Sequence, residues 1–367
     1  MSGLYLSALD LAHFRSHLSA RLRLDARPVV LHGPNGAGKT NLLEAVSLLS
    51  PGRGLRHAAA QEMVRQPAAP GWKVTAGLHA AGRAYRIETW SEGGAARQVR
   101  IDGKPATQTA LGHIAPVLWL VPSMDRLWTG TAEGRRRFLD RISLSFRPDH
   151  ADLSLAYDKA MRERNRLLKD QVRDARWYLA LEAQMARSGA AIQARRQAAL
   201  TRLREAQTEA ETAFPVAALE LCATEGTIPE TEGGLREALA ESRFRDLAAG
   251  RTLVGPHRAD LHAVYSAKGV PAASCSTGEQ KALLISLILA NARALAQDFG
   301  APPLVLLDEV AAHLDTDRRA ALHDEISALG AQAWMTGTGA ELFAGLGARA
   351  QWFEVTDSGK VTSACEG

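Results

Sequence analysis

A glycine-rich stretch near the N-terminus is the first part of the chain whose residue types and spacing could do chemistry. It reads GPNGAGKT and follows the pattern G-x-x-x-x-G-K-[ST] between an expected buried strand and an expected helix. In this pattern, backbone amides turn inward and surround phosphate groups at a helix N-terminus. We therefore expect a nucleotide-binding loop made of Gly33, Pro34, Asn35, Gly36, Ala37, Gly38, Lys39 and Thr40.

Charged and hydroxyl side chains at two places in the chain complete this chemistry. Lys39 can reach the β- and γ-phosphates of ATP, and the Thr40 hydroxyl is a suitable Mg²⁺ ligand. The stretch LVLLDE at residues 304–309 reads as a central strand that ends in two acids. Asp308 would hold Mg²⁺, usually through water, and Glu309 would polarise the attacking water as a general base. Lys39, Asp308 and Glu309 are therefore the predicted catalytic residues, with ATP and Mg²⁺ as cofactors.

The stretch SCSTGEQKALLI, residues 274–285, has two interpretations. Ser276, followed by Glu279 and an apolar run, forms a capping box at a helix start. The order of P-loop, S-x-G-E stretch and strand ending in two acids also resembles ABC-type ATPases. In that superfamily the signature serine and helix N-terminus face the γ-phosphate held by a second subunit. This resemblance implies that Ser276 and Gly278 contact nucleotide in a dimer, with Asp315 beside the second acid at the interface.

The elements that must position these residues predict an α/β fold: a P-loop ATPase lobe with an antiparallel β section, and an inserted helical arm. Apolar residues alternate with period two over the first 25 residues, and residues 72–106 read as short strands with turns. Between Pro148 and Pro215 apolar residues recur at helical spacing, broken by Arg164. The single glycine there, Gly189, predicts two long helices that fold back at or near it.

The composition fits a soluble globular protein. The composition is 46% hydrophobic and 23% charged, and the net charge of +4 permits a polyanionic partner. No apolar run reads as a membrane span, and the scattered cysteines fit a reducing cytoplasm.

Several further stretches resemble the RecF family of bacterial recombination mediators, a branch of ABC-type ATPases related to Rad50 and SMC proteins. The combination spans nearly the whole chain in the family's order, which makes the resemblance specific. The stretches are HFRSH (13–17), NLLEA after the P-loop, SPGRGLR (50–56), GRRRFLDR (134–141) and GPHRADL (255–261).

The resemblance implies that residues 1–130 and 251–367 form the N- and C-terminal parts of one ATPase lobe, with residues 131–250 as an inserted helical arm. It also implies an ATP-dependent DNA-binding protein of DNA repair, replication and the SOS response. ATP would drive formation of a homodimer, and weak, DNA-stimulated hydrolysis would act as a slow timer. The expected partners are duplex DNA and junctions of single- and double-stranded DNA, bound without sequence preference. RecR, RecO and RecA are the expected protein partners, in the cytoplasm and away from membranes.

The resemblance also suggests roles for arginines outside the nucleotide motifs. Arg15 of HFRSH would lie near the nucleotide, as the equivalent arginine is thought to in relatives; the alternative is an edge-strand charge. Arg135, Arg136 and Arg137 either contact DNA phosphates or a partner, or form a solvated helix face beside Asp140.

The chain departs from many ABC ATPases where they carry a switch histidine. It has Met335-Thr-Gly-Thr338, in which Thr336 or Thr338 could hydrogen-bond near the γ-phosphate. A transporter ATPase subunit would carry that histidine and a glutamine loop, and would lack the helical arm. Another SMC- or Rad50-like protein would need a longer insertion for an extended coiled coil.

Overall fold

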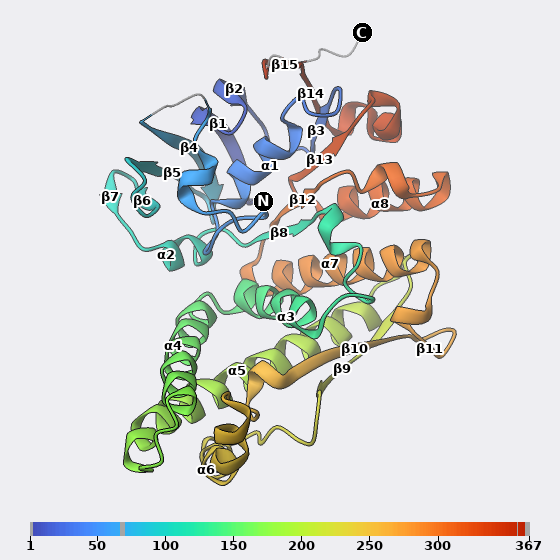
Figure 1. Ribbon diagram of the computed structural model, residues 1–367. Helices are drawn as coiled ribbons and strands as arrows, with labels where there is room; N and C mark the ends of the chain where they lie inside the picture. The colour runs from blue at the N-terminus through green and yellow to red at the C-terminus, as the bar shows by residue number, and fades with distance from the viewer. Residues whose placement is uncertain (1–2, 67–69, 358, 364–367) are drawn as a thin grey trace. The chain divides into compact units, whose positions relative to one another are not determined.

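The computed structural model describes residues 3–66, 70–357 and 359–363, apart from the side chain of His313. Cys365 lies outside these residues. The chain divides into two compact units, which we call the P-loop unit and the helical unit (Figure 1). The P-loop unit comprises residues 1–125, 206–215 and 276–367, and the helical unit comprises residues 126–205 and 216–275.

One sheet of the P-loop unit is antiparallel and forms the predicted β section. Its strand order is β2-β1-β4-β5-β6-β7. Every second side chain of β4 faces the core, as in a strand with one buried face. The pairing of β1 with β4 joins two segments that the sequence indicates only separately. The strands are β1 (Tyr5–Phe14), β2 (His17–Arg23), β4 (Gly71–Ala80), β5 (Arg83–Glu92), β6 (Gln98–Ile101) and β7 (Lys104–Pro105).

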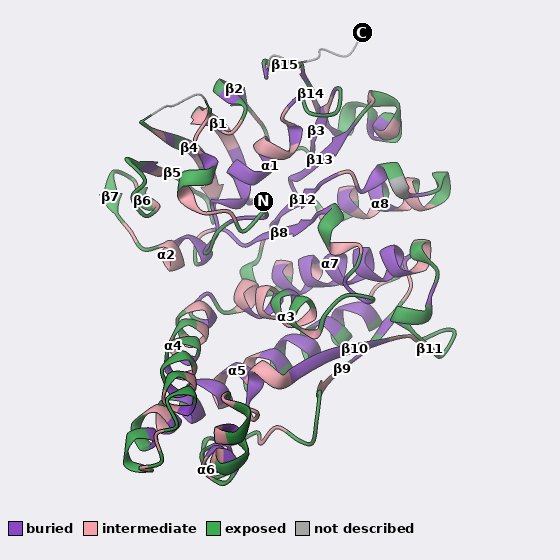
Figure 2. Ribbon diagram, in the orientation of Figure 1, coloured by how far each residue is buried: buried purple, intermediate pink, exposed green. Residues whose placement is uncertain are grey.

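The second sheet of the P-loop unit carries the nucleotide motifs and is parallel except at one edge. Its order is β15-β14-β3-β13-β12-β8, with only β15 antiparallel to its neighbour. Strands β12 and β13 are buried along their whole length, and β3 is buried except at His32 (Figure 2), which explains the apolar runs at Val29–Leu31 and Leu304–Leu307. The strands are β3 (Val29–His32), β8 (Val117–Leu120), β12 (Leu304–Leu307), β13 (Ala333–Gly337), β14 (Gln351–Val355) and β15 (Val361–Ser363).

Four α-helices belong to the P-loop unit, and one of them is unusually apolar. They are α1 (Lys39–Ser47), α2 (Gln108–Gly112), α7 (Thr277–Phe299) and α8 (Thr316–Leu329). By length and composition α7 could cross a membrane, but 72% of its apolar window is buried inside the protein. This burial identifies α7 as a core helix, and it packs against β8.

The helical unit combines long helices with a small antiparallel sheet of order β11-β10-β9. Helix α3 packs against β10 of that sheet. The helices are α3 (Ala132–Phe146), α4 (His150–Lys169), α5 (Arg176–Thr208, whose last residues belong to the P-loop unit) and α6 (Glu232–Ala249). The strands are β9 (Ala217–Ala223), β10 (Ala259–Tyr265) and β11 (Val270–Pro271).

Short 3₁₀ helices connect several of these elements. They are η1 (Ala60–Met63), η2 (Pro122–Met124), η3 (Pro256–Arg258), η4 (Ala272–Ser274), η5 (Ala311–His313) and η6 (Ala340–Arg349). The helix η3 leads directly into β10, and the stretch GPHRADL covers this junction.

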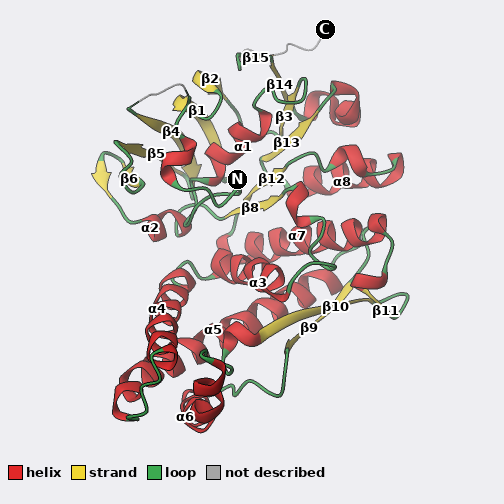
Figure 3. Cartoon of the chain, viewed as in Figure 1, coloured by secondary structure: helices red, strands yellow, loops and turns green. Residues whose placement is uncertain are grey.

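The predicted turn at Gly189 is wrong, because α5 runs through this residue without a break (Figure 3). The chain instead turns between α4 and α5, where Gln171 adopts a positive φ of 54°. A Cβ atom at Gly189 would lie 2.8 Å from Leu235 Cδ2 and 3.1 Å from Tyr157 Cε2. The glycine therefore permits close packing within the helical unit rather than a change of chain direction.

The boundary of the helical unit differs from the predicted range 131–250. Residues 251–275, expected in the ATPase lobe, belong to the helical unit because β10 pairs with β9 along its whole length. Residues 206–215 belong to the P-loop unit. Strand pairing between distant segments cannot be read from local composition, and this pairing decides the boundary.

Candidate nucleotide-binding site

The P-loop connects β3 to α1, and its glycines adopt conformations that other residues rarely take. Gly33, Gly36 and Gly38 have φ values of 145°, 84° and 105°. A Cβ atom at Gly38 would lie 2.6 Å from Ser16 Oγ and 2.8 Å from His17 Nε2. The glycines thus allow the backbone to turn tightly into the N-terminus of α1, where free amides can face an anion.

Lys39 begins α1, and its side chain lies back along the loop. Its ammonium group donates hydrogen bonds to the carbonyl oxygens of Gly33 at 2.6 Å and Pro34 at 2.8 Å. Burial lowers the pKa of Lys39, while the charges of Glu309 and Asp308 act in the opposite direction. Among the residues that the structure describes, no carboxylate forms an ion pair with this lysine, so its charge is available to a phosphate.

A chain of hydrogen bonds joins the P-loop to the two acids after β12. The Thr40 hydroxyl donates to the Asp308 carboxylate, with distances of 2.9 and 3.1 Å to its two oxygens. The Thr336 hydroxyl donates to Asp308 Oδ1 at 2.8 Å and accepts from the Glu309 amide at 2.9 Å. The parallel order β3-β13-β12 brings these residues together at the carboxyl ends of the strands.

Glu309 has a backbone conformation that is uncommon for its residue type. Its φ is 53°, in the left-handed region. Such a conformation costs on the order of 1–3 kcal/mol and persists only where the surroundings hold it. The hydrogen bond from the Glu309 amide to Thr336 is one such restraint. Thr336 therefore orients the Asp308 carboxylate and the Glu309 backbone. The sequence alone indicates only that Thr336 or Thr338 takes the place of the switch histidine of many ABC ATPases.

Thr40 and Asp308 also provide suitable oxygen ligands for Mg²⁺. A hydroxyl and a carboxylate lie within hydrogen-bonding distance of each other, and hard cations of this kind prefer oxygen ligands. No group of three or more histidine, cysteine or acidic residues within the described ranges could form a protein-only metal site. The donor set therefore fits Mg²⁺ held together with phosphate and water, and the ion would neutralise phosphate charge.

Arg15 contacts α1 rather than the P-loop backbone. Its guanidinium donates to both carboxylate oxygens of Glu44, at 2.9 and 2.6 Å, and to the Glu62 carbonyl at 2.7 Å. Glu44 is fully buried and also accepts a hydrogen bond from Arg56 at 3.1 Å. Arg15 thus lies about one helical turn from Thr40, and its contact with nucleotide stays a prediction.

His17, the last residue of HFRSH, is a supporting residue that the sequence reasoning missed. It is fully buried, and its Nε2 lies 3.1 Å from the Gly38 carbonyl oxygen. Its Nδ1 lies 2.9 Å from the Gly359 carbonyl oxygen. The imidazole therefore supports the P-loop backbone immediately before Lys39. His17 could have been identified from the sequence, because it belongs to the HFRSH stretch, from which only Arg15 was selected.

The capping box at Ser276 is present. The Ser276 hydroxyl accepts from the Glu279 amide at 3.4 Å, and Glu279 Oε2 accepts from the Ser276 amide at 2.8 Å. Asp315 caps α8 in a similar way, by accepting from the Arg318 amide at 2.8 Å. Arg318 Nη1 also lies 3.5 Å from the Gly278 carbonyl oxygen. Arg318, which sequence reasoning did not single out, thus connects the signature stretch to the loop of Asp315.

The three predicted arginines on α3 differ sharply in their surroundings. Arg135 forms a two-pronged ion pair with Asp260 at 2.7 and 2.8 Å, so its guanidinium joins α3 to β10. Arg136 donates to the Ala259 carbonyl at 2.7 Å. Arg137 is exposed and pairs with Glu133 one turn earlier. A role of these three arginines in DNA or partner binding stays a prediction. Arg135 is the least available of them, because both prongs of its guanidinium are bonded to Asp260.

The chain is similar to proteins of a known family. A family model described as the RecF/RecN/SMC N terminal domain matches residues 5–351. The chain is 49% identical to the DNA replication and repair protein RecF of Rhizobium etli, covering 96% of this chain and 97% of the relative. It is 48% identical to the RecF protein of Brucella suis, covering 96% of this chain and 95% of that relative.

Solved structures show the same fold at lower sequence identity. The recombination mediator protein RecF–ATP in the RecFOR pathway matches with a TM-score of 0.82 at 24% identity, covering 99% of each chain. An Smc head domain from Pyrococcus furiosus matches with a TM-score of 0.55 at 17% identity, covering 98% of this chain and 96% of that one. These matches confirm the predicted α/β fold class. With the full-length sequence matches, they show that the chain belongs to the RecF family of DNA replication and repair proteins.

Proposed function

We propose that this chain is an ATP-dependent DNA-binding recombination mediator whose ATPase cycle acts as a switch. The observation that carries the proposal is the hydrogen-bonded chain from Thr40 through Asp308 to Thr336 and Glu309. It joins a phosphate-binding loop to two acids from a strand more than 250 residues later in the sequence. A phosphate-binding site alone does not require this arrangement, whereas phosphoryl transfer to water does.

In the proposed reaction the chain binds the nucleotide phosphates through the P-loop amides and Lys39. Lys39 would exchange its two carbonyl partners for phosphate oxygens. Mg²⁺, held at Thr40 and Asp308, would neutralise phosphate charge. Glu309 would orient water and accept its proton, and Thr336 would hold the Glu309 backbone in place for that role.

The signature stretch would act on the nucleotide of a second copy. Within one chain, the side-chain bonds of Ser276 go to Glu279, and those of Asp315 go to Arg318. Within the described residues neither is bonded to the P-loop, so both remain available at the surface. The start of α7 combines a serine hydroxyl with a positive dipole end, and both suit a γ-phosphate. ATP would thus bridge two chains, and hydrolysis would release them.

Family membership supports the proposed DNA and protein partners. Its curated members are named DNA replication and repair proteins, and the solved RecF structures belong to the RecFOR pathway. We therefore propose that the ATP-bound dimer binds duplex DNA and its junctions with single strands, without sequence preference. With RecO and RecR it would help load RecA in gap repair and SOS induction, in the cytoplasm. The basic balance of the chain, net +4, is compatible with such a partner.

DNA binding measured by fluorescence anisotropy tests the proposal. Gapped, duplex and single-stranded substrates would be titrated with ATP, ADP or no nucleotide. We expect ATP to tighten binding to duplex or gapped DNA, and Ser276→Arg to remove that gain. Ser276→Asp is the sharper variant, because aspartate also caps a helix but repels a γ-phosphate.

Ser274→Arg is the matched control, since Ser274 is an exposed serine outside the capping box. It should behave as wild type. If ATP makes no difference to wild type, or if Ser276→Asp keeps the full ATP response, the proposed switch is wrong and Ser276 is only a helix cap.

A further inference from the structure

Two motifs that the ATPase chemistry leaves unused meet within the helical unit. GRRRFLDR begins on α3 and GPHRADL covers η3 and the start of β10. Arg196 of α5 connects them, because it donates to both carboxylate oxygens of Asp140, at 2.7 and 2.8 Å, and to the Pro256 carbonyl at 2.7 Å. Together with the Arg135–Asp260 pair, this contact fixes the relative position of α3, α5 and η3.

A cavity of about 450 Å³ that opens to solvent lies where these motifs meet. Its lining comes entirely from the helical unit, from α3, α4, α5 and the segment that leads into β10. The volume lies in the range of small-ligand sites, about 300–1,000 Å³. The cavity is therefore large enough for a small molecule or the end of a larger one.

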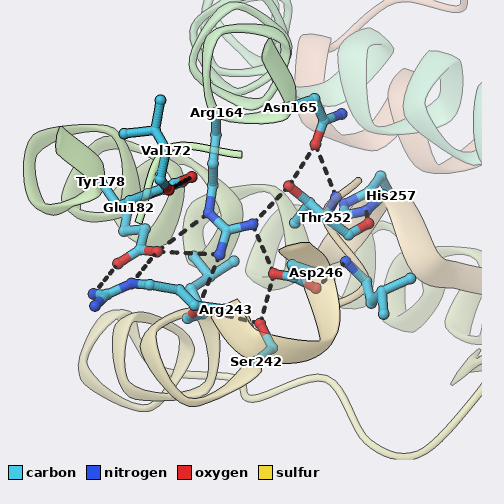
Figure 4. A network of polar contacts seen from close by, with 12 residues as sticks. Arg164, Asn165, Val172, Tyr178, Glu182, Ser242, Arg243, Asp246, Thr252 and His257 are labelled. Carbon is cyan, nitrogen blue, oxygen red and sulfur yellow. Dashed lines mark hydrogen bonds and ion pairs between the residues drawn. The ribbon is translucent and has the colours of Figure 1, made fainter. Parts of the chain in front are cut away.

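One residue that lines this cavity, Asn165, carries a hydrogen-bond donor without a partner among the described residues. Asn165 Oδ1 accepts from the amide and the hydroxyl of Thr252, each at 2.8 Å (Figure 4). Because Oδ1 of Asn165 faces Thr252, its Nδ2 points away from Thr252. This amide nitrogen has no hydrogen-bond partner among the described residues. His257 Nε2 lies 3.1 Å from the Thr252 carbonyl and must donate, so its Nδ1 accepts from the Tyr157 hydroxyl at 2.7 Å.

Positive charge also predominates in the lining. Five arginines line the cavity against three acids, Glu133, Asp140 and Asp158. Glu133 and Asp140 are paired with Arg137 and Arg196. His257 adds no charge near neutral pH, because burial lowers its pKa to about 4.

Two of the lining arginines lack a carboxylate partner. For Arg136 and Arg251, no acid within the described residues lies at ion-pair distance, and Arg136 is bonded only to the Ala259 carbonyl. Burial and the nearby charge of Arg196 lower the pKa of Arg136. A bound anion would relieve both effects, since it would replace lost hydration and offset the like charge.

We propose that this cavity is a binding site for a phosphomonoester, with Arg136 and Arg251 as its cationic groups and the Asn165 amide as a further donor. A phosphomonoester carries about −1.5 to −2 charges near pH 7, which matches the excess of two arginines. Planar guanidinium groups bind such oxygens in a two-pronged geometry. The phosphate would belong either to a free mononucleotide or to the phosphorylated end of a nucleic-acid strand.

Isothermal titration calorimetry with thymidine 5′-monophosphate tests the free-nucleotide source. The full-length protein would be saturated with Mg–ADP so that the P-loop is filled, and thymidine would serve as the uncharged comparison. We expect binding of the monophosphate and none of thymidine. Binding must persist in Lys39→Ala, which separates this site from the nucleotide site of the proposed function.

Fluorescence anisotropy with one hairpin oligonucleotide, carrying either a 5′-phosphate or a 5′-hydroxyl, tests the strand-end source. If strand ends are the ligand, the phosphorylated hairpin binds at least about tenfold more tightly, as expected for a charge-assisted hydrogen-bonded pair. Equal binding of the two hairpins assigns the site to free nucleotides, provided that the calorimetric arm is positive.

Two variants identify the cavity as the source of binding. Arg251→Gln removes an exposed charge, and Asn165→Asp keeps the acceptor for Thr252 while it replaces the free donor with a negative charge. Each should weaken phosphate binding about tenfold. Arg245→Gln changes an exposed arginine of α6 that does not line the cavity, and it should leave binding unchanged. The proposal is overturned if wild type neither binds thymidine 5′-monophosphate nor prefers the phosphorylated hairpin, or if both variants bind as wild type does.

Discussion

The P-loop region and a buried arginine network in the helical unit use the same kinds of polar groups in opposite ways. The network centres on Arg164 and joins α4, α5, α6 and Thr252 (Figure 4). Arg164 is fully buried and donates five hydrogen bonds, which equals the number of N–H groups on a guanidinium. Its acceptors are Glu182, Asp246, the Thr252 hydroxyl and the Leu239 carbonyl.

Charge in this network is balanced within the protein. Arg243 pairs with both oxygens of Glu182, at 2.8 and 2.6 Å, so two arginines meet two buried acids. In the P-loop region, Lys39 is bonded to carbonyls and Asp308 to hydroxyls. In the P-loop region, neutral groups thus hold Lys39 and Asp308 apart, and both charges remain available to a ligand. In the network, the opposite charges pair directly with each other, and these ion pairs stabilise the fold.

We expect the strongest effect of any substitution from Glu309 in the P-loop region, on the rate of ATP hydrolysis. Glu309→Gln removes the proposed general base but keeps the size of the side chain and its backbone bond to Thr336. We expect the rate of ATP hydrolysis to fall by about a hundredfold or more, with ATP binding retained. Steady-state ATPase assays and nucleotide titrations measure the two quantities. Unchanged hydrolysis would remove Glu309 from the mechanism.

Arg164→Ala should have the largest effect on the free energy of unfolding, and its effect should be on stability rather than on catalysis. It leaves Asp246 and Glu182 buried with a lost partner, which costs about 3–5 kcal/mol in the free energy of unfolding. Urea denaturation measures this loss, with the exposed Arg245→Ala as the control, for which we expect almost no change. If Arg164→Ala unfolds at the same urea concentration as wild type, the network does not stabilise the fold.

Thr336→Val tests whether the neutral groups of the site position the acids. It removes the hydroxyl between Asp308 and the Glu309 amide, and we expect kcat to fall about tenfold with a smaller change in KM. Thr336→Ser, which keeps the hydroxyl, should restore most of the rate. A valine variant with normal kcat would show that Glu309 holds its geometry without Thr336.

The smallest expected effect concerns the edge of the network, where His257 contacts Thr252. Because burial lowers its pKa to about 4 from 6.5, the unfolded chain binds more protons between these pH values. The contribution of His257 to stability is therefore complete above about pH 6.5 and declines as the pH falls towards 4, by at most about 1.4 kcal/mol per pH unit. Urea denaturation at pH 7 and pH 5 should show a smaller loss for His257→Gln than for wild type. An equal loss would assign the acid sensitivity to other groups.

The nucleotide motifs and the central strands could be predicted from the amino-acid sequence alone. Spacing between glycines, Lys39 and Thr40 is a local property, and a P-loop can be recognised because only certain residues permit its backbone path. The strand before Asp308 could be predicted for a similar reason, since a strand buried on both faces is apolar throughout. The capping box at Ser276 is likewise encoded in four adjacent residues.

The contacts between distant residues could not be predicted in this way, because they depend on how the elements pack. Thr336 lies between Asp308 and Glu309 because β13 pairs beside β12, and no local pattern encodes that neighbour. Arg164 interrupts an apolar helical pattern, yet it is fully buried because its partners come from α5, α6 and Thr252. Gly189 looks like a turn in the sequence, but it is the point where α5 packs closely against Tyr157 and Leu235. In each case the deciding contacts join residues far apart in the chain, whereas propensity and periodicity report only on neighbours.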